Sequence, residues 1–223
     1  MATKASAQWP GDCSCSFYDR TESDRIRGNV AFGSFSLIAQ TLRSFAGEEQ
    51  IYSRRMIPAS YKPRKKFMEL AIAEAKRAGD RGDYPIGAVI TRLTGRSEVV
   101  IANAGNRVKT SGSSIKHVEL ETLKYVCSGY GRYLPDFVLY STHEPCAMCA
   151  GACIWSRIGA VVYGVSQEDI AAYGRKGGTD YYKWRACLIP CQFVFEKGNH
   201  NIPVTGGFLR KECQKLFSYK AAE

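Results

Sequence analysis

Two short motifs contain residue types that can bind zinc and transfer protons. The first motif holds His117 and Glu119, and the second, later in the chain, holds Cys146 and Cys149 behind Pro145. An imidazole and two thiolates supply three ligands and leave the fourth position of a tetrahedral zinc ion for water, as in catalytic zinc sites. Zinc lowers the pKa of bound water from about 15.7 towards about 7. We therefore predict that His117, Cys146 and Cys149 bind one zinc ion per chain.

The spacing of the two cysteines predicts a helix. Cys146 and Cys149 are three residues apart, so on a helix they share one face. Pro145 suits a helix start, because it lacks an N–H that would have no intrahelical partner there. The positive end of the helix also favours thiolate over thiol. We therefore expect both sulfurs to face the metal from the first turn.

The carboxylate of Glu119 is the group expected to turn a zinc site into an enzyme. Hydrolysis by a metal-activated water needs a group that takes a proton from the water and delivers it to the leaving group. Residues two apart on a helix do not face each other, so Glu119 is poorly placed to share the ion with His117. We predict that it acts one water away from the metal. The alternative, a zinc ion that only joins two helices, would not need Glu119 and would prefer a fourth protein ligand.

The composition indicates a globular protein with a basic surface. The chain has 223 residues and a net charge of +10. Lysines and arginines that neutralise phosphates supply most non-specific affinity for nucleic acid, so RNA is a plausible partner. Basic surfaces are also common because they keep proteins in solution, and the charge therefore raises this hypothesis only modestly. No stretch reaches the roughly eighteen apolar residues of a membrane helix, so we expect no spanning segment.

Residues 1–60 differ in character from the rest of the chain. They are rich in Arg and Ser and contain an apolar patch, somewhat like an organellar targeting segment, but carry more acidic residues than such segments usually do. A disordered extension, a transit segment and a stretch outside the working protein are all open alternatives. Reduced thiolates and the lack of a visible secretory signal favour an intracellular, most simply cytoplasmic, location. We expect the zinc-dependent domain to span residues 61–223.

From Phe67 onward, hydrophobic periodicity predicts alternating helices and strands. Helices are expected over 67–78, 117–127, 146–155 and 208–218. Strands are expected over 86–93, 99–102, 137–141, 160–165 and 192–195, with a hairpin turn at 94–97. The order strand, helix, strand around the cysteine motif indicates a βαβ unit with parallel neighbouring strands.

The match to a known pattern extends beyond the zinc ligands. The H-x-E and P-C-x-x-C motifs form the signature of the zinc deaminases. The region from about Phe67 to Phe217 resembles the cytidine and deoxycytidylate deaminase superfamily, most closely its tRNA-specific adenosine deaminase and nucleoside deaminase branch. The strings that carry the resemblance lie at 85–90, 106–107, 117–119, 144–152, 156–164 and 205–213. The resemblance implies an α/β protein with a three-layer α/β/α fold, a five-stranded mixed sheet, zinc between two helix N-termini, and a homodimer.

The resemblance also implies which residues contact the substrate. Asn106 stands at the family's spacing before the zinc histidine and is expected to hydrogen-bond the substrate, although an ordinary turn asparagine is the alternative. The family usually has alanine where this chain has Val118, so the branched side chain could reshape the site. The residues expected to bind substrate are Asn106, Ile86, Gly87, Ala88, Val118 and Glu144.

The segment 166–204 is longer than the resemblance to the bacterial tRNA enzymes leads us to expect. It mixes aromatic and basic residues, which together can stack on and neutralise single-stranded nucleic acid. A lid over a free nucleoside and a subunit interface are the alternatives. The candidate nucleic-acid contacts are Arg175, Lys176, Lys183, Trp184 and Arg185.

The function expected from these features is hydrolytic deamination, in which oxygen replaces an exocyclic amine of a nucleobase and ammonia is released. Adenosine in tRNA is the first expected substrate. A free base or nucleoside, namely guanine, guanosine, cytosine or cytidine, is the main alternative. A non-catalytic RNA-binding subunit is a further alternative, but a dead paralogue would be expected to have lost Glu119, which this chain retains.

Overall fold

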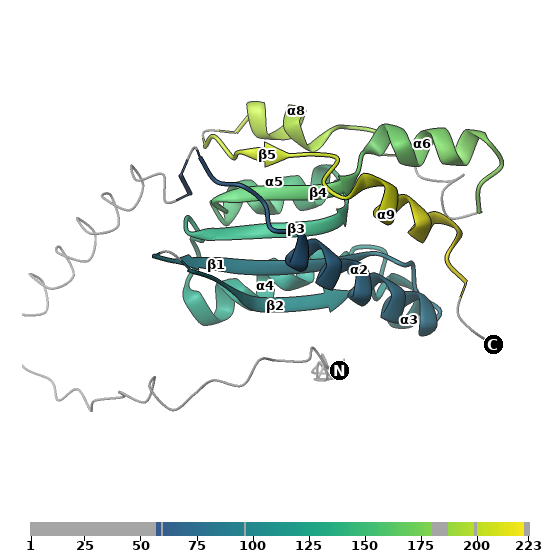
Figure 1. The fold of residues 1–223 in the computed structure, drawn as a ribbon, viewed down its shortest axis with the longest axis horizontal. Helices are drawn as coiled ribbons and strands as arrows, with labels where there is room; N and C mark the ends of the chain where they lie inside the picture. Colours follow the sequence, from purple (N-terminus) through teal and green to yellow (C-terminus); the bar gives the residue numbers. More distant parts are fainter. Residues whose placement is uncertain (1–56, 59, 96, 180–186, 199, 221–223) are drawn as a thin grey trace, which may run out of the picture.

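The computed structural model describes residues 57–220 apart from residues 59, 96, 180–186 and 199. These residues form a five-stranded sheet between two layers of helices (Figure 1). The strand order is β2-β1-β3-β4-β5. The predicted three-layer α/β/α fold with a mixed sheet is therefore confirmed. The strands are β1 (Gly87–Thr94), β2 (Ser97–Gly105), β3 (Phe137–His143), β4 (Ala160–Val165) and β5 (Val204–Thr205).

Strand directions follow from the connections. A tight turn at Gly95, which has a φ of +61°, joins β1 and β2 as an antiparallel hairpin. β1 and β3 are also antiparallel, whereas β3, β4 and β5 run parallel to one another. A parallel pair needs a crossover, and the helix between β3 and β4 provides it, as predicted for the βαβ unit. Every residue of β3 is buried, as a central strand requires.

The helices cover both faces of the sheet. α2 (Lys65–Asp80) and α9 (Arg210–Gln214) lie on one face, and α4 (Val118–Tyr130) and α5 (Ala147–Trp155) lie on the other (Figure 1). α8 (Cys191–Glu196) packs against α5, while α3 (Val108–Ser111), α6 (Gln167–Arg175) and the 3-10 helix η2 (Lys215–Ser218) complete the described elements. None of the helices in this described part is long and apolar enough to cross a membrane.

Two hydrophobic cores flank the sheet, and β3 contributes to both. Its residues Phe137 and Leu139 join the core beneath α4 and α5, whereas Val138 and Tyr140 join the core beneath α2. This division follows from the alternation of side chains along a strand. The side of β3 that carries Leu139 therefore faces the helices that carry the zinc-binding motifs.

Two predicted elements near the C-terminus were wrong or incomplete. The expected strand at 192–195 is helix α8, in which Cys191 and Phe195 are both buried. Their spacing of four residues puts both side chains on one helix face. A strand would put Phe193 on the same face as Phe195, but Phe193 is 53% exposed. The fifth strand is instead Val204–Thr205, which pairs with β4. The expected helix over 208–218 is divided into α9 and η2.

The folded domain includes at least one residue of the expected N-terminal extension. Ile57 is only 1% exposed and belongs to the core that also holds Phe67, Met68 and Tyr140. It lies against Gly159, where a Cβ atom would approach Ile57 Cγ1 to 2.5 Å. We therefore propose that the domain begins at or before Ile57 and not at Tyr61.

Ile57→Ala in the full chain is expected to lower the free energy of unfolding by about 2–5 kcal/mol, because it removes a fully buried aliphatic side chain. Urea denaturation followed by circular dichroism measures this change. Pro58→Ala, at the neighbouring exposed position, is the matched control and should change stability by less than about 0.5 kcal/mol. Equal stability of the two variants would place Ile57 outside the cooperative fold.

Candidate zinc and catalytic site

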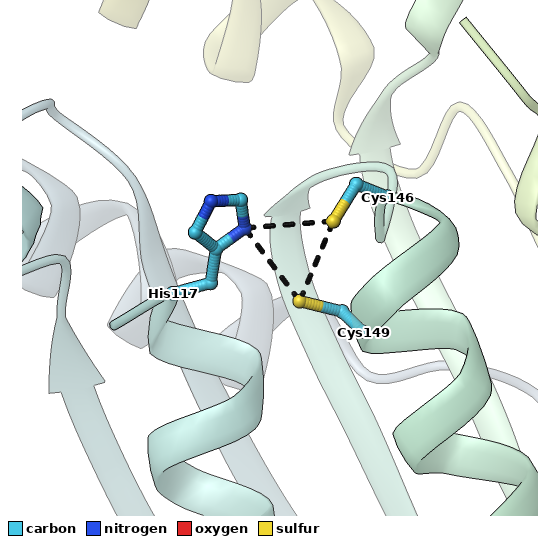
Figure 2. A group of neighbouring side chains, drawn as sticks. All are labelled: His117, Cys146 and Cys149. Atoms are coloured by element: carbon cyan, nitrogen blue, oxygen red, sulfur yellow. Dashed lines mark hydrogen bonds between the residues drawn. The ribbon is translucent and has the colours of Figure 1, made fainter. Parts of the chain in front are cut away.

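Three predicted metal ligands come together between the N-terminal ends of α4 and α5 (Figure 2). His117 precedes the first turn of α4, Cys146 is the N-cap of α5, and Cys149 lies in its first turn. The His117 Nδ1 atom is 3.5 Å from Cys146 Sγ and 3.6 Å from Cys149 Sγ. The two sulfurs are 3.7 Å apart.

These separations suit one tetrahedral zinc ion. Zinc bonds of about 2.3 Å to sulfur and 2.0–2.1 Å to nitrogen imply sulfur–sulfur and sulfur–nitrogen separations of about 3.8 Å and 3.6 Å. The three distances in the structure agree with these values. Soft thiolate ligands with one imidazole are also the donor set that zinc accepts. The residues present therefore fit zinc, with three protein ligands and a fourth position for water.

The cysteine helix begins slightly later than predicted. Pro145 precedes the N-cap, and α5 starts at Ala147. The helix still directs its positive end towards both sulfurs, and this favours negative charge on them. The hydrogen bond with Cys149, followed by the ring of His117, lowers the pKa of the Cys146 thiol to about 3 against the opposing effect of burial. The same sulfur–sulfur contact raises the pKa of the Cys149 thiol.

Glu119 lies beside the three ligands and not among them. It is the second residue of α4, and its side chain is buried. Its Oε1 accepts a hydrogen bond from Ser141 Oγ at 3.1 Å, and its Oε2 is 3.7 Å from Cys149 Sγ. Within the described part of the chain, the group of side chains close enough to share a metal ion contains His117, Cys146 and Cys149. This placement suits a carboxylate that moves protons next to a metal.

The loop that carries Asn106 is fixed on both sides. The Asn106 N–H donates to the carbonyl of Ile86 at 2.8 Å, and its Oδ1 accepts from the N–H of Val108 at 2.9 Å. Asp83 holds the start of α3 by accepting hydrogen bonds from the N–H groups of Lys109 and Thr110. The bond to Oδ1 fixes the direction of the Asn106 side chain within the loop.

The other expected substrate residues have clear packing roles. Ile86, Ala88 and Val118 are buried together in the core beneath α4 and α5. Gly87 faces the opposite layer, because a Cβ atom there would approach the carbonyl oxygen of Ala71 in α2 to 2.0 Å. Only glycine allows this close approach of strand and helix.

Glu144 connects the cysteine motif to the segment that follows β4. Its two carboxylate oxygens accept hydrogen bonds from the N–H groups of Gln167, at 2.7 Å, and Cys191, at 2.8 Å. The carboxylate is buried and therefore needs such partners. This arrangement favours an anchoring role for Glu144, which pins the starts of α6 and α8 next to the zinc motif.

The structure describes two of the five candidate nucleic-acid contacts. Arg175 ends α6 and forms an exposed ion pair with Glu168 at 2.6 Å, and Lys176 follows it at the C-cap. Lys183, Trp184 and Arg185 lie outside the described residues.

Sequence reasoning missed Ser141, the partner of Glu119. Ser141 lies two residues after Leu139 on β3, so the alternation of the strand puts its hydroxyl on the side of α4. The hydroxyl residues Ser141 and Thr142, which follow an apolar run just before the cysteine motif, were the signal available in the sequence.

Comparison with known proteins agrees with this geometry. The family described as the cytidine and deoxycytidylate deaminase zinc-binding region matches residues 61–165. The tRNA-specific adenosine deaminase of Bacillus subtilis is 36% identical over 153 residues, which cover 68% of this chain and 84% of that protein. The probable cytosine deaminase of Schizosaccharomyces pombe is 30% identical over 147 residues, which cover 66% of this chain and 85% of that protein.

Solved structures show the same fold. A structure from work on A-to-I editing by tRNA deaminases at the wobble position of transfer RNA is 34% identical, with a TM-score of 0.51, and covers 69% of this chain and 99% of its own. The guanine deaminase of Nitrosomonas europaea is 24% identical, with a TM-score of 0.52, and covers 86% of this chain and 96% of its own. The chain belongs to the cytidine and deoxycytidylate deaminase family and is a zinc-dependent hydrolytic deaminase of nucleobases or nucleosides.

Proposed function

We propose that this deaminase acts on adenosine in tRNA and converts it to inosine with release of ammonia. The observation that carries the substrate assignment is the 36% identity to a tRNA-specific adenosine deaminase across 84% of that protein. The net charge of +10 suits a polyanionic substrate. The proposed nucleic-acid contacts are Arg175 and Lys176 at the end of α6. They also include Lys183, Trp184 and Arg185, which lie outside the described residues.

The side chains of the site divide the chemistry among them. His117, Cys146 and Cys149 would hold zinc, which supplies a Lewis acid and an acidic water when bound. Glu119 takes the two protons of the attacking water one after the other on its carboxylate, whose Oε2 lies on the side of Cys149. It delivers one proton to the ring nitrogen and one to the leaving amine. The side-chain NH2 of Asn106 donates a hydrogen bond to the substrate. Ile86, Ala88 and Val118 form the apolar layer that shapes the site and limits water.

A free base or nucleoside is the second candidate substrate. The similarity to the probable cytosine deaminase of Schizosaccharomyces pombe favours it, as does the valine at position 118, which differs from the alanine that the family usually has. The retained Glu119 disfavours a non-catalytic subunit. Only tRNA carries backbone phosphates, so only its binding should depend strongly on ionic strength.

If tRNA is the substrate, its binding is expected to weaken steeply with salt, by a slope of about −0.7 in log K against log salt for each phosphate contacted on a single strand. A panel of tRNA, nucleosides and free bases, assayed for ammonia release at several salt concentrations, tests this expectation. A short unstructured RNA without the substrate adenosine serves as the control for non-specific binding. Efficient turnover of a free nucleoside or base, without salt-sensitive tRNA binding, would transfer the assignment to the second candidate.

We also propose that two copies of the chain form a homodimer through the outer side of α5. Met148 and Trp155 lie two turns apart on this helix and are 37% and 84% exposed, and Phe193 of the neighbouring α8 is 53% exposed. Large apolar side chains that gather on one surface usually mark an interface. The family resemblance implies a second copy as the occupant.

Trp155→Lys is expected to shift the protein from twice the mass of one chain to a single chain in size-exclusion chromatography with light scattering, because a charge would be buried at the interface. Val99→Lys, at an apolar β2 position that is 43% exposed, is the matched control and should leave the mass unchanged. A monomeric wild-type protein at micromolar concentration would overturn the proposal.

An intracellular, reducing location completes the proposal, because the site depends on two reduced cysteines. Imaging of the full chain with a C-terminal fluorescent tag, with and without residues 1–56, tests whether the N-terminal segment redirects it to an organelle. Secretion of the tagged chain would contradict this location.

A further inference from the structure

The carboxylate of Glu119 has a fixed partner in the centre of the sheet. Ser141 Oγ donates to Glu119 Oε1 at 3.1 Å, and the two side chains are 0% and 3% exposed. The other oxygen, Oε2, lies 3.7 Å from Cys149 Sγ. One end of the carboxylate is therefore tied to β3 while the other end faces the metal ligands.

Ser141 is among the most firmly held positions in the fold. Its backbone lies between two neighbouring strands, where it pairs with Ala88 of β1 and with Tyr163 of β4. Glu119, in contrast, projects from the second residue of α4 on a flexible stem. A hydrogen bond from a rigid strand to a flexible carboxylate sets the direction of the carboxylate and does not move the strand.

The surroundings make this bond necessary. Ala88, Val118 and Leu139 are buried in the same apolar core next to the site. A carboxylate oxygen shielded from water needs a hydrogen-bond donor. Ser141 supplies one to Oε1 from the sheet, and Oε2 remains on the side of the metal ligands. Ser141 acts on the site through its hydrogen bond to Glu119.

We propose that Ser141 is a positioning residue of the deaminase, whose hydroxyl orients the Glu119 carboxylate so that Oε2 faces the metal ligands and the reacting atoms. This inference rests on the proposed role of Glu119 in proton transfer. It predicts that loss of the hydroxyl lowers kcat with little effect on substrate affinity, because a misdirected proton-transfer group slows the chemical step without changing the binding contacts.

The sheet offers a matched comparison. Thr91 Oγ1 donates to the buried carboxylate of Glu98 at 2.6 Å, on β1 and β2 and apart from the zinc ligands. Thr91→Val removes the same kind of bond, a buried hydroxyl to a buried carboxylate. It is expected to reduce thermal stability and to leave kcat within about twofold, and so it measures the purely structural cost.

The decisive variants at position 141 are Ala, Thr and Val, each studied in the zinc-loaded full chain. Threonine keeps the hydroxyl, and valine has nearly the same shape without it. We expect Ser141→Ala and Ser141→Val to lower kcat by about 10- to 100-fold with KM within about threefold, while Ser141→Thr retains most of the activity. Zinc content should stay at one per chain in all of them.

Crystal structures of the zinc-loaded wild type and Ser141→Ala give a second readout that does not depend on turnover. We expect a single Glu119 conformer bonded to Ser141 in the wild type, and a rotated or divided carboxylate in the variant. An unchanged Glu119 conformer, or equal kcat values for Ser141→Thr and Ser141→Val, would overturn the proposal. A wild-type protein that deaminates no substrate of the panel would instead refute the proposed function, and the crystal structures would still decide whether Ser141 orients Glu119.

Discussion

Replacement of Glu119 by glutamine is expected to lower kcat by about 10²–10⁴-fold, while the protein keeps one zinc ion per chain. Glutamine has nearly the same shape as glutamate but cannot accept and release the proton that hydrolysis requires. Its side chain can still accept a hydrogen bond from Ser141. Steady-state ammonia release measures kcat, and elemental analysis of the purified protein measures zinc.

Glu121→Gln is the matched control, because Glu121 lies in the same first turn of α4 and carries the same charge. We expect its kcat to stay within about twofold of the wild type. A Glu119→Gln protein that lost its zinc would show that the carboxylate is a metal ligand. A tenfold loss of kcat corresponds to about 1.4 kcal/mol of activation free energy. A smaller loss in Glu119→Gln would show that Glu119 transfers no essential proton.

Much of the site could be predicted from the sequence because its geometry is local. Cys146 is the N-cap of α5 and Cys149 lies in its first turn, so a spacing of three residues brings their sulfurs within 3.7 Å at the start of one helix. His117 is the N-cap of α4 and Glu119 is its second residue. Residues two apart at a helix start point in different directions, so this difference could also be predicted. The hairpin of β1 and β2 and the βαβ unit around α5 were equally recognisable, because periodicity and turn residues lie close together in the chain.

Contacts between distant segments could not be predicted in the same way. The expected strand at 192–195 is α8, because its burial depends on packing against α5 and not on local propensity. The two bonds from Glu144 to Gln167 and Cys191 join segments that only the fold brings together. The pairing of Ser141 with Glu119 has the same origin, since it depends on which strand lies beneath α4.

Replacement of Cys149 by alanine is expected to remove both zinc and activity. Only His117 and Cys146 would remain as protein ligands, and two ligands do not hold zinc in competition with water as three do. Zinc that binds the folded chain and not the unfolded chain also stabilises the fold, by about 4.1 kcal/mol when free zinc is a thousandfold above its Kd. Chelation should therefore lower the Tm of the wild type, and added zinc should restore it.

Cys153→Ala separates loss of metal from loss of packing. Cys153 lies one turn beyond Cys149 on α5, is fully buried, and is not in the metal-binding group. Its replacement should lower Tm modestly, because a small buried side chain is shortened, but the protein should keep its zinc and the full Tm shift on chelation. Cys149→Ala should show a low Tm that neither chelator nor added zinc changes. If Cys149→Ala still responded to zinc as Cys153→Ala does, the ion would be bound elsewhere and the assignment of these ligands would fail.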